Sequence, residues 1–454
     1  MITLYCAKWV LPIIAAPISD GAVAVEGARI ASVGPRAALA EKFAGARLCD
    51  LGTAAILPGL VNCHSHLELT AMRGFLEREE RDFFAWLRKL TVTRLELMTP
   101  DDLRVAAMWG AVEAARAGVT CLGDASDNAG ASLSALAEAG LRGVVYQEVF
   151  GPDRNLVRER LQELQDKIAA LRSLETDRVR VGVSPHAPYT VSAPLLESVT
   201  DYAIAEELPV MIHAAESAAE TWFMRDGSGP FADSLRQRGI EWQAPGLSTV
   251  QYLASLGVLR ARPLLAHCVT VDDTDIAALR DTRTRVAHCP KSNAKFGHGR
   301  APYAAFIRSG VAVGFGSDSV ASNNTCDMLE EARFAALLAR AGPEAADGRE
   351  LLSADRALHD ATRGGALALG LNQQIGALAE GWQADLAVVS LAGAHQLPVY
   401  DPVAALVFAS SGRDVIMTVV AGREVYRDGR VVTVDEERLG ARMREINRKL
   451  AGAQ

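Results

Sequence analysis

The chain of 454 residues is 49% hydrophobic, which is ample for a large buried core. Its 47 Lys and Arg are outnumbered by 55 Asp and Glu, and no basic cluster interrupts the net charge of -8, so nucleic acid is not an expected partner. The seven cysteines form no CxxC pair, which is typical of the reducing cytoplasm, and no run approaches the ~18 apolar residues of a membrane span.

The first elements are short β-rich runs between turn residues. KWVLPIIAAPIS (8–19) resembles a signal peptide in its apolar run, but Pro12 and Pro17 interrupt it and GAVAVEGARIASVG (21–34) follows, so we predict strands. The last part of the chain is similar, with GWQADLAVVSL (381–391) followed by further strands and a terminal helix over 435–452. We therefore predict a small β-sandwich domain formed by both termini, residues 1–57 and 373–454.

The middle of the chain, residues 58–372, alternates short apolar strands with helical patterns. The strands are expected over 59–66, 118–125, 142–150, 179–187, 209–216, 262–269, 284–290 and 311–318. Fully apolar strands separated by helices indicate a parallel sheet covered on both faces. Eight such units predict an α/β fold of the (β/α)8 TIM-barrel type, with a doubly wound open sheet as the alternative.

Polar residues recur where the predicted strands end. They are His64, His66, His186, His213, Glu216, His267, His288 and Asp318. A single histidine at a strand end is more often a satisfied polar group than a ligand, but the series involves six strand ends. Because the carboxyl ends of barrel strands form the active-site face, the series predicts a site there.

The spacing of His64 and His66 suits a metal ion. Residues i and i+2 of a strand point to the same side, so both imidazoles can reach one ion. With His213 and Asp318 they would supply three nitrogens and one oxygen. This donor set suits Zn or Fe and leaves a position open for water.

The motifs resemble those of the amidohydrolase superfamily over nearly the whole chain. PGLVNCHSH, SPHAPYT, HAAE, AHCV, CPKSNAKFGHG and GSDS stand in the family's order. The chain most resembles the mononuclear branch, which includes cytosine deaminase, the S-adenosylhomocysteine, methylthioadenosine and aminodeoxyfutalosine deaminases, and the triazine hydrolases. This resemblance implies that His64, His66, His213 and Asp318 bind the metal.

The resemblance also implies one divalent metal ion. In binuclear relatives a carboxylated lysine ends strand four and bridges two metals. Here that strand reads VRVGVSPHAPYT and has no lysine, and Lys291 follows strand seven instead. We expect Zn at this site, with Fe and Mn as alternatives.

The family assigns a role to each remaining strand-end residue. Glu216 resembles the proton shuttle, although a carboxylate at a helix start is also favoured by the helix dipole. Asp318 would exchange protons with the attacking water, and His267 would orient that water or act as a fifth ligand. His186 resembles a substrate-contacting histidine, with a structural hydrogen bond as its alternative.

Two loops are candidate substrate contacts. Trp86 belongs to an aromatic segment at helical spacing, which is either ordinary helix packing or a lid over an aromatic ring. Glu68 and Arg73 in the same loop are further candidates. Glu148 and Arg154, after strand three, could meet ribose hydroxyls or a substrate carboxylate.

Other polar residues follow the barrel strands or lie outside them. They are His288, Ser292, Asn293, His298, His359 and His395. In relatives the CPKSNAKFGHG segment lines the pocket rim, so Ser292 and Asn293 are expected to orient that loop, with His298 at the rim or in solvent. His359 and His395 are expected to be structural or at the surface.

Together these motifs predict a metal-dependent hydrolytic deaminase of an aminated N-heterocycle. SPHAPYT and the aromatic loop favour an adenine-type nucleoside over cytosine: S-adenosylhomocysteine, methylthioadenosine, adenosine or aminodeoxyfutalosine. HLELT departs from the more apolar pattern of S-adenosylhomocysteine deaminases. The alternatives are a triazine-type amino- or chlorohydrolase, a deaminase of a free base or pteridine, and a metal-free scaffold. We expect a cytoplasmic homo-oligomer with a small-molecule substrate and no membrane partner.

Overall fold

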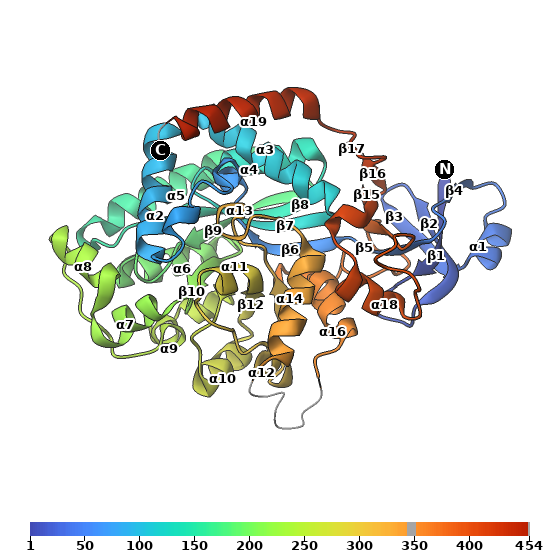
Figure 1. The fold of residues 1–454 in the computed structure, drawn as a ribbon. Helices are drawn as coiled ribbons and strands as arrows, with labels where there is room; N and C mark the ends of the chain where they lie inside the picture. Colours follow the sequence, from blue (N-terminus) through green and yellow to red (C-terminus); the bar gives the residue numbers. More distant parts are fainter. Residues whose placement is uncertain (343–350, 453–454) are drawn as a thin grey trace.

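The computed structural model describes residues 1–342 and 351–452. A barrel covered by helices occupies most of the molecule, and a sheet built from both chain ends lies at one side of it (Figure 1). Within the described residues, no helix combines the length and apolarity needed to cross a bilayer.

Eight parallel strands form the barrel. They are β6 (Leu60–Ser65), β7 (Val119–Ser126), β8 (Arg142–Val149), β9 (Val179–Pro185), β10 (Met211–Ala214), β11 (Leu264–His267), β12 (Arg285–His288) and β13 (Val313–Phe315). Hydrogen bonds group them into two four-stranded sheets, β6-β7-β8-β9 and β10-β11-β12-β13. Parallel bridges from Val183 to Val210 and from Ser65 to Asp318 join the two sheets at both edges. The predicted barrel fold is therefore confirmed, and the open sheet is not.

Helices follow the strands and cover the barrel. The larger ones are α3 (Pro100–Arg116), α4 (Ala129–Ala139), α5 (Val157–Leu171), α6 (Ala193–Ala205), α10 (Asp273–Thr282) and α14 (Met328–Arg340). Every residue of β7 and β8 is buried, as a parallel sheet with both faces covered requires. Three further helices lie between β10 and β11: α7 (Ala218–Asp226), α8 (Gly229–Gln237) and α9 (Thr249–Ser255).

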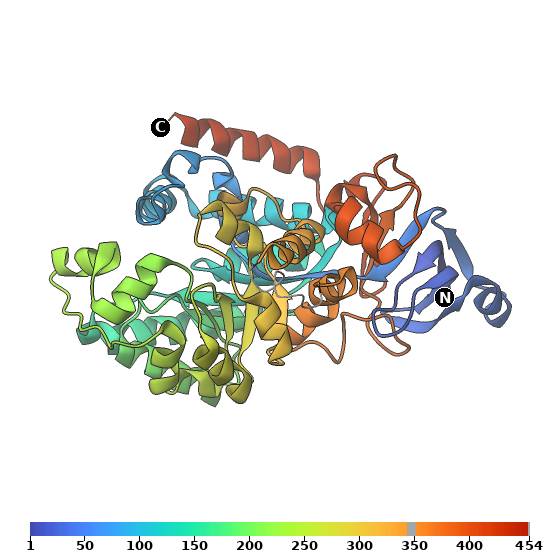
Figure 2. The same ribbon diagram turned by 60° about the horizontal axis from the view of Figure 1, so that its bottom comes forward.

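The strands of the two chain ends are hydrogen-bonded together in one sheet. Its nine members are β1 (Ile2–Val10), β2 (Ile18–Glu26), β3 (Arg29–Pro35), β4 (Arg47–Asp50), β5 (Ala54–Pro58), β14 (Leu386–Ser390), β15 (Val415–Val420), β16 (Arg423–Arg427) and β17 (Arg430–Val431). β5 pairs with both β1 and β14, so it joins the strands of the N-terminal and C-terminal parts of the chain in one sheet. The same blue and red segments lie side by side in Figure 2.

The alternation of side chains along β14 explains how this sheet packs against the barrel. Leu386 and Val388 pack within the terminal sheet's own core, whereas Ala387 and Val389 belong to the barrel's hydrophobic cluster. Successive side chains of a strand point to opposite faces, so one strand contributes to both cores.

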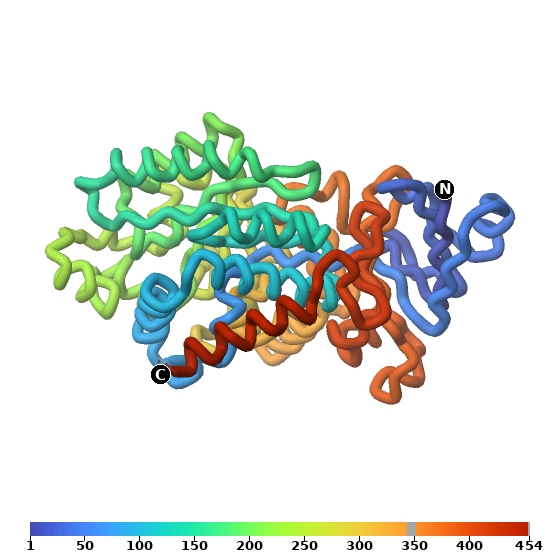
Figure 3. Tube along the Cα trace, turned by 90° about the horizontal axis from the view of Figure 1, so that it is seen from above, coloured from blue at the N-terminus to red at the C-terminus, as the bar shows by residue number. Residues whose placement is uncertain are grey.

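The C-terminal helix α19 (Glu436–Ala451) packs on the barrel along α3 and ends beside α2 (Phe83–Val92) (Figures 1 and 3). Ile446 and Leu450 are buried in one cluster with Trp86 of α2 and Leu103 of α3. The terminal helix therefore supports the loop that follows β6.

A buried ion pair links the barrel to the terminal sheet. Arg142 donates through Nε to Asp385 Oδ2 at 2.9 Å and through Nη2 to Oδ1 at 3.3 Å, with 4% and 1% of the two side chains exposed. Asp385 Oδ1 also accepts the Ala421 backbone N–H at 2.8 Å.

We expect Asp385→Ala to lower the free energy of unfolding by about 3–5 kcal/mol, because it leaves a buried guanidinium without its partner. Urea denaturation measures this change. The control is Arg104→Ala, whose ion pair with Asp101 is half exposed and is expected to contribute less than about 1 kcal/mol. An equally small effect of Asp385→Ala would contradict the role given to this pair.

Candidate metal centre and active site

Four predicted ligands meet at the carboxyl ends of the barrel strands. His66 Nε2 lies 3.2 Å from His213 Nε2, and Asp318 Oδ1 lies 3.4 Å from His64 Nε2 and 3.5 Å from His66 Nε2. Three imidazole nitrogens and one carboxylate oxygen thus face a common point.

Local backbone geometry brings β6 and the end of β13 together. Asp318 N donates to His64 O at 2.9 Å, and a parallel bridge pairs Ser65 with Asp318. A Cβ at Gly316 would lie 2.7 Å from the His64 Cβ, so only glycine allows this approach. Asp318 itself has a φ of 58°, a left-handed conformation that is uncommon outside glycine and recurs at functional sites.

Neighbouring groups orient the ligands. His213 donates through Nδ1 to the His186 carbonyl at 2.9 Å, which leaves its Nε2 lone pair facing the cluster. Asp318 Oδ2 accepts the Ser292 hydroxyl at 2.6 Å and the Ser322 hydroxyl at 2.8 Å. Oδ1 takes part in neither bond, and it is the oxygen that faces His64 and His66.

The donor set fits a divalent metal ion. His64 Nε2 is buried and has no hydrogen-bond partner within the described chain. Burial lowers the pKa of His64, lowers that of His66 to about 3, and lowers that of His213 well below its ordinary value. Neutral imidazoles are the form that binds metal, and three of them with one carboxylate match the ligand types of zinc.

Glu216 adjoins this cluster. Burial, followed by the charges of Asp318 and Glu220, raises the Glu216 pKa well above its ordinary value, which favours the protonated carboxyl. Its Oε1 lies 3.6 Å from His267 Nε2, while His267 Nδ1 donates to Asn293 Oδ1 at 2.9 Å. The Glu216 carboxyl and the Nε2 of His267 therefore face the same space.

A second carboxyl lies on the β8 side of the cluster. Glu148, His186 and His213 have donor atoms within 4.8 Å of one another. Within the described residues, Glu148 Oε1 is buried without a hydrogen-bond partner, and burial raises the Glu148 pKa well above its ordinary value. Glu148 therefore offers a ligand an unpaired carboxyl oxygen.

These groups form the floor of a cavity of about 800 Å³. Its walls are mainly aromatic and apolar side chains: Phe83, Phe84, Trp86, Leu87, Phe150, Tyr189, Phe231, Leu235 and Phe296. Of the predicted substrate contacts, His186, Trp86 and Glu68 line the cavity. A volume of this size suits a nucleoside with a substituent.

Two of the predicted substrate contacts lie outside the cavity lining. Arg73 and Arg154 are not among the described residues that line the cavity. Arg73 forms an ion pair with Glu113 of α3, which holds it outside. Arg154 is exposed on a 3-10 turn (Arg154–Leu156), which Asp153 caps by accepting the Asn155 backbone N–H.

Hydrogen bonds fix the Glu68 side chain in the cavity wall. Its carboxylate accepts the backbone N–H groups of Asp127 and Asn128, each at 3.1 Å, and lies 3.4 Å from Arg94 Nη1. Arg94 also pairs with Asp127 at 3.0 Å. Arg94 was not predicted from the sequence, since no motif marks a single arginine in a long loop.

Other supporting residues were also missed. Glu220 accepts the N–H groups of Ala215 and Glu216, each at 2.8 Å, and thereby holds the turn that carries the acid. The signal was available in SAAE, because Ser217 caps α7 and a glutamate three residues later is typical of a capping box. His298, expected at the rim or in solvent, lies 3.7 Å from Glu216 Oε1 through its Nε2.

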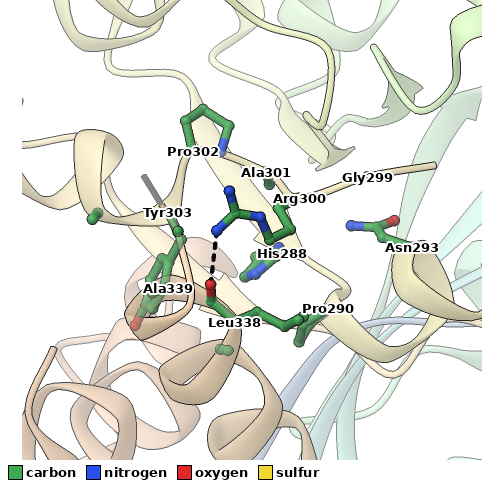
Figure 4. Close-up of a pocket in the computed structure, with 13 residues that line it drawn as sticks. His288, Pro290, Asn293, Gly299, Arg300, Ala301, Pro302, Tyr303, Leu338 and Ala339 are labelled. Carbon is green, nitrogen blue, oxygen red and sulfur yellow. Dashed lines mark hydrogen bonds between the residues drawn. The ribbon is translucent and has the colours of Figure 1, made fainter. Parts of the chain in front are cut away.

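His288 faces a different space from the other strand-end histidines. It lines a smaller cavity of about 190 Å³ together with Asn293, Arg300 and Tyr303 (Figure 4). Arg300 donates to the Leu338 carbonyl at 3.0 Å across this cavity. His288 is therefore not part of the cluster on the main cavity floor.

Comparisons with known proteins agree with this geometry. Residues 55–425 match the model of the amidohydrolase family. A 5-methylthioadenosine/S-adenosylhomocysteine deaminase of Nitratidesulfovibrio vulgaris is 34% identical over 443 residues, which is 95% of this chain and 93% of that protein. Pelotomaculum thermopropionicum has a protein of the same name that is 33% identical over 436 residues, 95% of each chain.

Solved structures show the same architecture. An adenosine deaminase from Xanthomonas campestris with bound zinc has a TM-score of 0.84 at 28% identity, covering 99% of this chain and 98% of that one. The atrazine chlorohydrolase of Arthrobacter aurescens, complexed with zinc, has a TM-score of 0.85 at 24% identity, which is a likeness of fold, over 98% of this chain and 100% of that one. The chain belongs to the amidohydrolase family.

Proposed function

We propose that this protein is a hydrolytic deaminase of an adenine-type nucleoside that depends on one divalent metal ion, zinc, held by His64, His66, His213 and Asp318. The observation that carries the proposal is the position of Glu216 beside these ligands on the floor of a nucleoside-sized cavity, where burial raises the pKa of its carboxyl. The full-length relatives named as methylthioadenosine/S-adenosylhomocysteine deaminases support the choice of substrate.

The chain's own residues supply the proton transfers. A bound divalent ion lowers the pKa of water. Asp318 takes a proton from the water that adds to the amino-bearing carbon, and Glu216 donates its proton to the adjacent ring nitrogen. Asp318 then protonates the amine, the C–N bond breaks, and the remaining hydroxyl proton returns to Glu216. Water and the amine are thereby converted to a ring carbonyl and ammonia.

Residues around the metal site position the substrate and the attacking water. His267, fixed through Nδ1 by Asn293, directs Nε2 towards the water. His186 uses Nδ1 with the Thr190 hydroxyl at 2.8 Å, which leaves Nε2 for the heterocycle. Trp86 provides part of an aromatic wall. A cytoplasmic location and a homo-oligomeric state remain part of the same proposal, the former because all seven cysteines are free.

An ammonia-release assay on zinc-loaded protein tests the function. We expect release from methylthioadenosine, S-adenosylhomocysteine or adenosine and none from chloro- or aminotriazines. Activity on triazines alone would favour the alternative hydrolase. Failure to bind metal at all, with no turnover of any heterocycle, would favour the scaffold.

Ser322→Ala is expected to weaken zinc binding about 10–100-fold, because Asp318 loses one of the two hydroxyls that fix its Oδ2. Competition with a chelator of known affinity measures the effect. Ser198→Ala on α6 is the control, since that hydroxyl bonds only the Pro194 carbonyl. Equal zinc affinity in both variants would contradict the orienting role of Ser322.

A further inference from the structure

The charges of the cavity are unevenly distributed. The floor and inner wall carry carboxyl groups, and the described lining contains three arginines, Arg88, Arg94 and Arg238. Arg94 is neutralised by Glu68 and Asp127, at 3.4 and 3.0 Å. No free cation of the described chain is thus left near the metal centre to receive an anion.

Arg88 and Arg238 differ from Arg94 because both are exposed at the outer part of the cavity lining. Arg88 belongs to α2, and Arg238 follows the last residue of α8. Within residues 1–342 and 351–452, neither guanidinium has an acidic or hydrogen-bonding partner. Arginine keeps its charge at any physiological pH, so both are available cations.

The two arginines lie on helix faces that meet. The rings of Phe84 and Phe231 pack at a centroid distance of 5.8 Å, which places α2 against α8. Arg88 follows Phe84 by four residues, and Arg238 follows Phe231 by seven. Arg88 therefore shares the Phe84 face of α2, and Arg238 directly follows the helix that carries Phe231, so both arginines adjoin the contact between α2 and α8.

A continuous aromatic wall connects this mouth to the metal centre. Ring centroids are 4.7 Å apart for His213 and His186, 6.0 Å for His186 and Tyr189, and 4.0 Å for Tyr189 and Phe231. The Phe231 ring in turn contacts Phe84. A ligand along this wall would therefore place an apolar segment between the cavity floor and the arginines.

We propose that Arg88 and Arg238 determine specificity by binding an anionic group, a carboxylate or a phosphate, at the end of the substrate's 5′ substituent. This inference rests on the proposed nucleoside deaminase function. With the purine at the metal centre, the substituent follows the aromatic wall and its anion reaches the two arginines of the cavity lining.

Two matched 5′-thioadenosines test the proposal. One carries a propyl group and the other a 2-carboxyethyl group of the same length, so they differ chiefly in the terminal charge. We expect wild-type protein to show the higher kcat/KM for the carboxyethyl compound, with the preference decreasing as ionic strength rises. In the double variant Arg88→Gln/Arg238→Gln, the ratio of kcat/KM for the anionic and neutral compounds is expected to fall about tenfold or more. Adenosine 5′-monophosphate, compared with adenosine, distinguishes phosphate from carboxylate as the anion.

Arg236→Gln is the matched control, because Arg236 lies on α8 but pairs with Asp233 at 2.8 Å and is outside the cavity lining. Its ratio should equal that of wild type. An unchanged ratio in the double variant, or an equal loss for both compounds, would overturn the proposal. Wild-type protein that releases ammonia from no nucleoside would instead overturn the proposed function, so the two failures are distinguishable.

Discussion

Glu216→Gln is expected to lower kcat about 10²–10⁴-fold while zinc content stays at the wild-type level. The amide has nearly the same shape as the protonated carboxyl, but it cannot transfer a proton to the ring nitrogen. Steady-state ammonia release and metal analysis of the same preparation measure both quantities. Burial disfavours the ionised form of Glu216, so the neutral amide should be accommodated at this position.

Glu197→Gln on the outer face of α6 is the control, because that carboxylate is exposed and should affect neither quantity. Turnover of Glu216→Gln within about twofold of wild type would remove Glu216 from the proton-transfer role. Loss of zinc together with activity would instead show that Glu216 supports the ligands and would leave its role as an acid unproven.

Asp318→Ala is expected to abolish activity and to weaken zinc binding by more than about 100-fold. This loss should exceed that caused by removing a residue that only hydrogen-bonds to a metal ligand. Asp318 is the one carboxylate of the cluster, and the histidines lower its pKa well below the ordinary value despite the opposing effect of burial. Zinc titration of the apo-protein, read out by thermal denaturation, measures the lost affinity, since a ligand bound only by the folded state raises Tm.

Asp318→Asn provides the comparison for this variant. It preserves the side-chain volume and one oxygen but removes the charge, so we expect zinc affinity between those of wild type and Asp318→Ala. Full zinc occupancy in Asp318→Ala under the conditions that load wild type would exclude Asp318 as a ligand.

Local periodicity was sufficient to predict the barrel and the meeting of His64, His66, His213 and Asp318 at its strand ends. Alternation along β6 directs His64 and His66 to one side, and parallel strands bring His213 and Asp318 to the same end. These relations depend on strand direction and spacing, which the sequence expresses directly.

Contacts between distant segments were not predictable in the same way. Arg73 was assigned to the substrate by its place in the loop, but its partner Glu113 lies 40 residues later on α3. Arg94 meets Asp127 from a neighbouring loop, and Phe231 reaches the cavity from an insertion after β10. Likewise, only the pairing of β5 with both β1 and β14 shows that the terminal strands form one sheet.

The most direct test of the central claim is mass spectrometry of the nucleoside product after reaction of zinc-loaded protein with methylthioadenosine in ¹⁸O-labelled water. Hydrolytic deamination at the proposed site predicts a product in which the amino group is replaced by one labelled oxygen, with one ammonia released per product molecule. Release of free adenine, an unlabelled product, or unreacted nucleoside alone would contradict it.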